Sequence, residues 1–246
     1  MLINDWDISL AGARQWNVIP GYCDISNNSE WARGSPIPVF FSNQIGFKPL
    51  KVVLLIKGAG RQEILENCST VLEHLLDPAL LTLEKFDHKF YGILKKHSFT
   101  ENPMNITFVD YNRAAKMELE FSVYECGDLI TQTFTGLQTF TVNNLGNIRS
   151  PVTIEITPQI GAASIELTGI CQDPNTKTDL PVTIRNLTAG EKVVLNGETG
   201  LITEDGVLKA GDADIWELPT LLPGENQITV TSDRMEIVVK FHPFYM

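Results

Sequence analysis

A short apolar run, two glycines and a helix-like stretch follow one another in the order of a phosphate-binding turn. Val52–Ile56 reads as a strand, Gly58-Ala59-Gly60 follows it, and helical periodicity begins at Arg61. Dinucleotide-binding proteins use this order to present a helix N-terminus to a phosphate. Their fingerprint has a third glycine three positions later, where this chain has Glu63, and a carboxylate there would repel the phosphate. We therefore interpret the glycines as permitting a tight turn and expect no cofactor.

An acidic cluster in the second half of the chain offers oxygen ligands of the kind that Ca²⁺ prefers. Its members are Asp212, Asp214 and Glu217. The spacing lacks the remaining positions of a calcium-binding loop, so we expect a solvated acidic loop and no metal. Trp216 lies inside the same stretch and is the only tryptophan of the second half. Its large apolar ring makes it a candidate for carbohydrate contact, although Trp216-x-Leu218 is equally typical of a core strand.

Nucleophiles and metal ligands elsewhere lack the spacing that catalysis requires. There is no His-x-x-x-His, no Cys-x-x-Cys and no Gly-x-Ser-x-Gly. The four cysteines stand singly, which predicts reduced and mostly buried thiols: Cys23, Cys68, Cys126 and Cys171. A carboxylate pair for glycoside hydrolysis can be distant in sequence, but nothing singles out such a pair. We expect no catalytic residue and no enzyme, with a hydrolase as the least favoured interpretation.

The first half of the chain predicts a sheet with one helix. Apolar residues repeat with helical spacing from Arg61 to Asp77, and Pro78 disfavours a helical residue before it. The segment after the helix reads as a hairpin that ends in Phe90–Leu94. Further strands are expected around Asn105–Val109 and Lys116–Glu125. In the latter, apolar and polar residues alternate, which indicates a sheet with one solvated face.

The second half predicts an antiparallel sandwich, because short β-rich runs recur there without a helical pattern. Asn196-Gly197 and Asp205-Gly206 indicate two-residue hairpin turns, and Ser232-Asp233 is expected to join two strands. The expected strands are Val152–Thr157, Ser164–Ile170, Pro181–Arg185, Glu191–Leu195, Thr199–Thr203, Gln227–Thr231 and Met235–Phe241. A Thr/Gln/Gly-rich stretch between Asp128 and Val142 sets the expected domains at residues 1–135 and 136–246.

Composition excludes several classes of function. The 246 residues are 43% hydrophobic, which is enough for packed cores and excludes global disorder. The net charge of −11 lacks the electrostatic footprint of a nucleic-acid or anionic-membrane binder, and no apolar run is long enough to cross a bilayer. Acids stand near the start where a signal peptide would have Lys or Arg, so synthesis in the cytoplasm is expected.

Several segments in a shared order resemble the distal tail (Dit) proteins of siphophages and prophages. In the first half, Ala79–Glu84 running into Lys89–Leu94 is similar to a family segment, and Met117–Cys126 looks like the strand that closes the N-terminal domain. Gly127-Asp128-Leu129 departs from the family's Tyr-Asp-Pro-like ending. In the second half the similar segments are Asn144–Asn147, Pro151–Ile156, Val194–Thr199 and Leu221–Val230.

The resemblance implies a mainly β virion structural protein at the tip of a long non-contractile tail. It implies an N-terminal, β-sandwich-like domain with helix and hairpin that forms a ring, usually a hexamer, and a C-terminal galectin-like sandwich. The partners would be the tail tube protein, the tail-associated hub or fibre protein and, in some phages, receptor-binding proteins. DNA would be passing cargo, and no membrane contact is expected.

Two hypotheses follow about residues in such a ring. The predicted hairpin carries Phe86, Phe90 and Tyr91, which are candidates for apolar contacts between subunits; packing on the subunit's own helix is the alternative. The acidic charge would discourage phosphate binding if it lined the channel, although residues 136–246 hold −7 of it and residues 1–135 only −4. A carbohydrate-binding module or receptor-binding protein acting through the C-terminal sandwich is the alternative function.

Overall fold

The computed structural model describes residues 1–246 except 32, 35, 102–113 and 174–177. The chain divides into two compact units, residues 1–125 with Met246 and residues 126–245. The division falls before the expected boundary at residue 135, because the Thr/Gln/Gly-rich stretch itself forms two strands. One of them, β10 (Ile130–Thr135), pairs along its length with β21 (Met235–Phe241) of the second unit.

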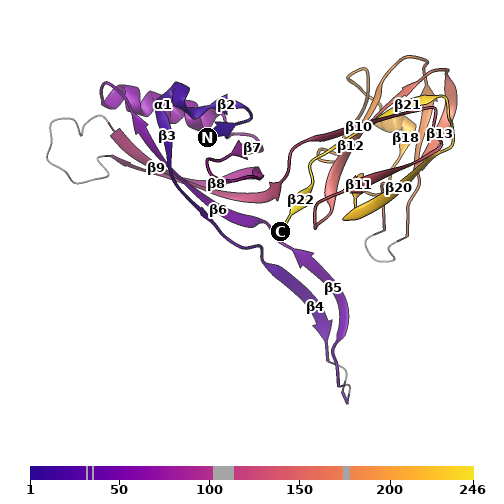
Figure 1. Ribbon diagram of the computed structural model, residues 1–246, viewed down its shortest axis with the longest axis horizontal. Helices are drawn as coiled ribbons and strands as arrows, with labels where there is room; N and C mark the ends of the chain where they lie inside the picture. The colour runs from indigo at the N-terminus through magenta and orange to yellow at the C-terminus, as the bar shows by residue number, and fades with distance from the viewer. Residues whose placement is uncertain (32, 35, 102–113, 174–177) are drawn as a thin grey trace. The chain divides into compact units, whose positions relative to one another are not determined.

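Most strands of the first unit join in one sheet, in the order β2-β1-β7-β8-β9-β6-β3 (Figure 1). Their bounds are Leu2–Ile3 (β1), Trp6–Asp7 (β2), Ala13–Pro20 (β3), Lys48–Lys57 (β6), Ala79–Thr82 (β7), Lys89–Glu101 (β8) and Ala114–Cys126 (β9). The β7–β8 pairing confirms the expected hairpin, and β9 contains the expected strand Lys116–Glu125. The strand expected at Asn105–Val109 lies outside the described residues.

The core of the first unit is formed where the alternating faces of the strands meet the helix. Met117, Leu119, Phe121 and Val123 of β9 are all at most 3% exposed, as their alternation with polar residues predicts. Helix α1 (Arg61–Glu73) covers the same core through Ile64, Cys68 and Val71. The helix and the sheet therefore bury one another's apolar faces.

Helix α1 ends earlier than its periodicity predicts, at Glu73 and not at Asp77. The next turn is tighter, since the Leu75 amide donates to the Leu72 carbonyl at 3.0 Å instead of continuing the α-helical pattern. Pro78 disfavours helical backbone only at Asp77, so it limits the segment but does not by itself explain the end at Glu73. Leu75 stays in the core, whereas Leu76 is 80% exposed.

A two-stranded hairpin, called the arm below, extends from the first unit (Figure 1). It consists of β4 (Ile25–Glu30) and β5 (Val39–Ile45), which pair only with each other. The arm prolongs the β3–β6 ladder, since the Gly21 amide donates to the Pro49 carbonyl at 2.7 Å and the Gly46 amide to the Asp24 carbonyl at 2.8 Å. Each residue of β4 is exposed to solvent.

The second unit is a pair of sheets that share one core. The first sheet runs β10-β21-β12-β15-β16-β17, with β19 paired to β12, and the second runs β11-β20-β13-β14-β18. The remaining bounds are Thr139–Asn144 (β11), Ser150–Pro158 (β12), Ala162–Thr168 (β13), Val182–Leu187 (β14), Val193–Asn196 (β15), Ile202–Glu204 (β16), Val207–Leu208 (β17), Ala213–Asp214 (β18), Thr220–Leu221 (β19), Gly224–Val230 (β20) and Phe244–Tyr245 (β22). All seven expected strands are present, β21 with the expected bounds and the others with shifted ends.

The two turns predicted from Asx-Gly pairs differ in outcome. Asp205-Gly206 links β16 to β17 with positive φ at both residues, 46° and 83°, which confirms a two-residue turn. The prediction for Asn196-Gly197 was wrong, because the chain returns only after Leu201. A Cβ at Gly197 would lie 2.2 Å from the Pro219 carbonyl oxygen, so this glycine permits close backbone packing instead of forming a tight turn.

Candidate functional site

The glycines after β6 form the strand-to-helix turn of a structural connection. The first-turn carboxylate occupies the place that a phosphate would need, since Glu63 accepts a hydrogen bond from the Ala59 amide at 2.6 Å. Gly58 is tightly packed, with a Cβ there only 3.0 Å from the Ile64 nitrogen. The carboxylate thus uses an amide of the turn in the way an anion would.

In the acidic stretch 212–217, Asp212 and Asp214 form ion pairs with different basic residues. Asp212 forms an ion pair with Lys209 at 3.4 Å and accepts from the Asn186 amide nitrogen at 2.9 Å. Asp214 forms an ion pair with Arg185 instead. Among the described residues, no group of His, Cys, Asp and Glu side chains has the geometry to hold a metal ion.

The aromatic residues proposed for the ring interface differ in exposure. Phe90 is 1% exposed and lies inside the first unit's core. Phe86 is half-buried against that core and meets Phe90 edge to face, with ring centroids 5.5 Å apart. Tyr91 follows on β8 and is also half-buried. Phe90 therefore packs within its own subunit, and only Phe86 and Tyr91 retain accessible surface.

Trp216, the candidate for carbohydrate contact, lies on the surface of the second unit. Its side chain is 79% exposed and Leu218 is 49% exposed, and neither belongs to a strand. The core-strand interpretation of this pair was therefore wrong. The neighbouring Ile215 packs against the core in their place.

Strand β3 presents an apolar surface along the free edge of the first unit's sheet. The strand ends the sheet order and contains a bulge between Gln15 and Asn17 that leaves Trp16 without a partner on β6. Bulges of this kind redirect a side chain out of the regular ladder. Trp16 is 57% exposed and Ile19 is 53% exposed. An edge strand with such side chains can pair with another chain.

The arm extends this apolar surface. Tyr22, at its base, is 92% exposed, and Ile25, Trp31 and Ile37 are each more than half exposed. A hairpin of two strands is at best marginally stable alone in water. The arm together with Trp16, Ile19 and Tyr22 therefore has the composition typical of a contact surface.

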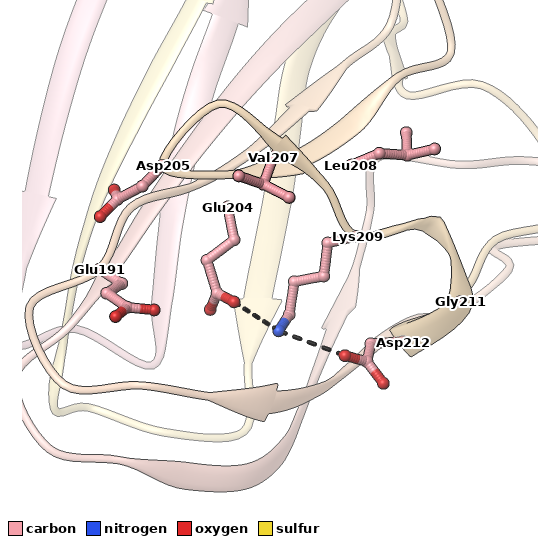
Figure 2. A pocket seen from close by; sticks show the side chains of 8 residues that line it. All are labelled: Glu191, Glu204, Asp205, Val207, Leu208, Lys209, Gly211 and Asp212. Atoms are coloured by element: carbon pink, nitrogen blue, oxygen red, sulfur yellow. Dashed lines mark hydrogen bonds and ion pairs between the residues drawn. The ribbon is translucent and has the colours of Figure 1, made fainter.

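A pocket of about 590 Å³ opens in the second unit beside β17, the edge strand of its sheet (Figure 2). Exposed Val207 and Leu208 line it from β17. Its other lining residues are Glu191, Glu204, Asp205, Lys209, Gly211 and Asp212. Four carboxylates thus face a single ammonium group.

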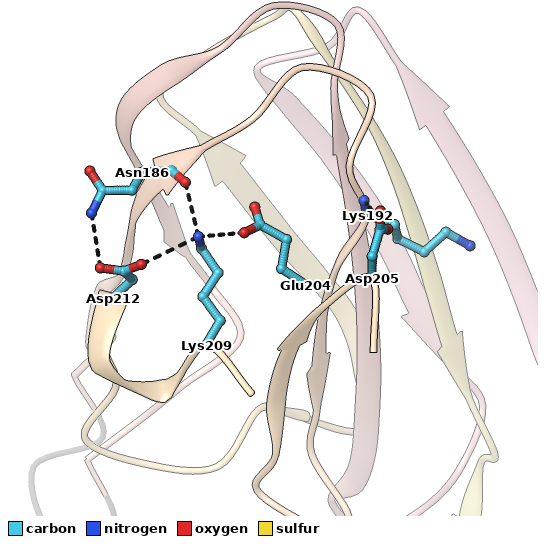
Figure 3. Close-up of polar contacts among 6 residues, drawn as sticks. All are labelled: Asn186, Lys192, Glu204, Asp205, Lys209 and Asp212. Atoms are coloured by element: carbon cyan, nitrogen blue, oxygen red, sulfur yellow. Dashed lines mark hydrogen bonds and ion pairs between the residues drawn. The ribbon is translucent and has the colours of Figure 1, made fainter. Parts of the chain in front are cut away.

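Lys209 is the centre of a polar network at the floor of this pocket (Figure 3). Its Nζ donates to Glu204 Oε2 at 2.7 Å and to the Asn186 carbonyl at 2.9 Å. Its side chain is only 7% exposed. Burial lowers the pKa of Lys209, but the hydrogen bonds to Glu204 and Asp212 outweigh burial, so its pKa is raised and it stays charged.

The cysteines are free thiols, and three of the four are buried. Burial raises the pKa of Cys68 to about 11 and that of Cys171 to about 12. A thiol with so high a pKa is a poor nucleophile at neutral pH. Among the described residues, no helix has the length and apolar composition of a membrane span.

These features define a class of fold: a helix-covered sheet with a projecting arm, followed by an all-β two-sheet unit. It is the fold of phage distal tail (Dit) proteins, as expected from the sequence. The crystal structure of SPP1 Dit, described as a paradigm of the hub adsorption apparatus in Gram-positive infecting phages, is 13% identical and has a TM-score of 0.66. The match covers 100% of this chain and 98% of that one.

The phage P2 baseplate contains a chain of the same fold. Its structures in the activated conformation with Ca and with Sr match with TM-scores of 0.57 and 0.56, at 10% and 11% identity. Each match covers 96% of this chain and 92% of the other. No protein-family model and no curated protein matches the sequence.

Sequence reasoning missed both contact surfaces, although each left a signal. Trp16, Tyr22 and Trp31 are aromatic residues scattered among polar and turn-forming neighbours, which is unusual for a segment without a partner. The pocket has a weaker signal in the sequence, because Glu191 and Glu204 approach one another only through the pairing of β15 with β16.

Proposed function

We propose that this protein is a structural component of a phage tail baseplate, located at the virion tail tip. In this proposal, copies of the first unit form a ring that joins the tail tube protein to the tail-associated hub or fibre protein. The likeness to Dit and baseplate chains over nearly the full length of both partners supports it. No catalytic step is part of this function.

The observation that carries ring formation is the apolar surface of β3 and the arm. Trp16, Ile19 and Tyr22 are exposed, and none of them belongs to the described core of the first unit. If the arm of one copy lies on the next, the contact is head-to-tail, and repeating it by rotation closes a ring. We propose six copies per ring.

The experiment is light scattering and negative-stain microscopy of the purified chain at tens of micromolar, with and without its tail tube protein. We expect a particle of about six times 27.4 kDa. Trp16→Ser with Tyr22→Ser should abolish the ring and leave the circular dichroism spectrum unchanged.

The matched control is Leu10→Ser with Leu76→Ser, which changes two exposed apolar residues of the same unit outside the arm. The control should still form rings. A monomer under all conditions would contradict the ring, and a ring that survives Trp16→Ser with Tyr22→Ser would contradict the role of the surface formed by β3 and the base of the arm.

Phe86 and Tyr91 are proposed as secondary contacts of the ring. Both are half-buried, so each can pack on its own subunit and still offer surface to a neighbour. Tyr91→Ala should weaken the ring without dissolving it, as measured by the concentration at which the scattering mass falls by half.

DNA is proposed to pass through the ring as cargo. The chain's net charge of −11 would keep a channel lined by its carboxylates from binding phosphate. A reconstruction of the ring tests this directly. A basic or neutral channel wall would contradict it.

Carbohydrate binding by the second unit is the alternative function, and the exposure of Trp216 favours it. This residue is one of four tryptophans of the chain and the only one of the second unit, so its contribution to the fluorescence is the part that Trp216→Ala removes. Stacking on a sugar would shift the emission when host wall polysaccharide is added. In Trp216→Ala the shift and the binding should both vanish.

A further inference from the structure

The pocket beside β17 has an excess of negative charge that its own lysines do not neutralise. Lys209 is already engaged by Glu204 and Asp212. Lys192 directs its Nζ to Glu155 at 3.0 Å, away from the Asp205 carboxylate (Figure 3). Within the part of the chain that the structure describes, Glu191 and Asp205 therefore form no ion pair with either lysine.

A buried acceptor in the pocket wall also lacks a partner within the described chain. Oε1 of Glu204 is buried and has no hydrogen-bond donor among the described residues, while Oε2 is held by Lys209. Such an unpaired buried oxygen is rare in native proteins, and a water, an ion or a donor group of a bound partner can satisfy it. Figure 2 shows this carboxylate between Glu191 and Lys209, on the floor of the pocket.

The rim of the pocket adds an apolar and strand-like component. Val207 is 72% exposed and Leu208 is 65% exposed, and both lie on β17. Because β17 ends its sheet, its outer edge can accept a further strand. An extended segment added there would place alternate side chains on opposite faces.

We propose that this pocket and β17 dock an extended protein segment in which lysine or arginine alternates with apolar residues. The cationic side chains enter the pocket toward Glu191, Glu204 and Asp205, and the apolar ones cover Val207 and Leu208. This inference goes beyond ring formation and rests on the proposed function only in that the segment belongs to another virion protein.

The test uses the full chain and three blocked hexapeptides, which alternate arginine with valine, glutamate with valine, and arginine with serine. Binding is measured from amide chemical shifts during titration. We expect the arginine–valine peptide to shift residues 201–212 and to bind more weakly as salt is raised. The glutamate–valine peptide should not bind, and the arginine–serine peptide should bind more weakly.

The decisive variant is Glu191→Gln with Asp205→Asn, which removes the two unpaired charges and leaves the Lys209 network intact. Asparagine accepts the positive φ at residue 205 and can still accept from the Lys192 amide, as Asp205 does at 2.9 Å. Affinity should fall roughly tenfold. The matched control, Glu166→Gln with Asp233→Asn, changes two exposed acids outside the pocket and should bind as the parent does.

Four results would overturn the proposal: no peptide binding, equal affinity of the double variant and its control, equal affinity of the arginine–serine peptide, or a response of the pocket to millimolar Ca²⁺ but not to peptide. Light scattering of the same samples separates this test from the ring. A chain that forms rings but does not bind the peptide refutes the docking inference alone.

Discussion

The two units cover their cores in different ways, and this decides what each leaves exposed. In the first unit, α1 closes the core of a single sheet through Ile64, Cys68 and Val71. In the second, two sheets close on one another through the alternating apolar residues of strands such as β12. One helix leaves the β3 edge and the arm uncovered, whereas in the second unit the edge strand β17 ends its sheet with two exposed apolar residues, Val207 and Leu208.

The exposed surfaces differ in chemistry as well as in position. The arm of the first unit presents aromatic and aliphatic side chains, so its contacts should depend on apolar burial and change little with salt. The pocket of the second unit presents carboxylates beside two aliphatic residues, so its contacts should weaken as salt is raised. The comparison indicates one surface suited to permanent assembly and one suited to a charge-selected partner.

The largest expected effect tests whether Phe90, in the hairpin of β7 and β8, belongs to the core of the first unit. Phe90→Ala should lower the free energy of unfolding of the first unit by about 3–5 kcal/mol, because it leaves a cavity where the side chain is 1% exposed. Hydrogen exchange measured by mass spectrometry would show loss of protection in residues 1–125 and not in residues 126–245. A loss of rings with unchanged protection would instead place Phe90 in a subunit interface.

A smaller effect tests the polar floor of the second unit's pocket. Lys209→Met should lower the free energy of unfolding by about 1–3 kcal/mol, since it leaves the Glu204 carboxylate buried without a cation. Lys192→Met, whose side chain is 50% exposed, is the control and should change it by less than about 0.5 kcal/mol. Urea titration checks both. Equal losses would mean that Lys209 contributes no more than a surface lysine.

A prediction of intermediate size concerns the turn before the edge strand β17, because this turn positions the strand. Gly206→Ala places a side chain at φ 83° and should cost about 1 kcal/mol, although the space around it is open. Gly211→Ala, where the backbone needs no positive φ and space is also open, should be close to neutral. Thermal unfolding distinguishes them. A neutral Gly206→Ala would show that β17 is not held by this turn.

The smallest effect concerns a feature that both units share, a glutamate between two lysines. Hydrogen bonds from Lys116 and Lys51 lower the pKa of Glu118 to about 2. Burial raises the pKa of Glu155, but hydrogen bonds from Lys240 and Lys192 outweigh it, so its pKa is also lowered. Both glutamates therefore stabilise the fold above their ordinary pKa of 4.5, and this stabilisation is lost as pH falls through their lowered pKa values, which for Glu118 is about 2.

Stability should accordingly decline between about pH 5 and pH 2. Glu118→Gln and Glu155→Gln should each flatten the decline by less than about 1 kcal/mol, because both side chains are partly solvated. Carboxyl chemical shifts give the two midpoints separately. A titration midpoint of Glu118 near 4.5 would show that Lys51 and Lys116 do not form these hydrogen bonds when the protein is in solution.

Much of the fold could be predicted from local patterns. The alternation of Met117, Leu119, Phe121 and Val123 gave the buried face of β9, because successive side chains of a strand point to opposite faces. Asp205-Gly206 gave its turn because few residue pairs accept two positive φ angles. The same Asx-Gly pattern gave a wrong prediction at Asn196-Gly197. There the glycine is needed for close packing against Pro219 and not for its backbone conformation.

What the sequence by itself determined is the helix, several strands of each unit and the acidic charge of the chain, since these depend on neighbouring residues or on composition. Only the tertiary structure decided which aromatics are buried and which are exposed, because Phe90 and Trp16 are both large aromatic residues whose burial depends on what packs over them. It also brought Glu191 and Asp205 to one pocket. Contacts of that kind depend on strand pairing, which local pattern does not specify.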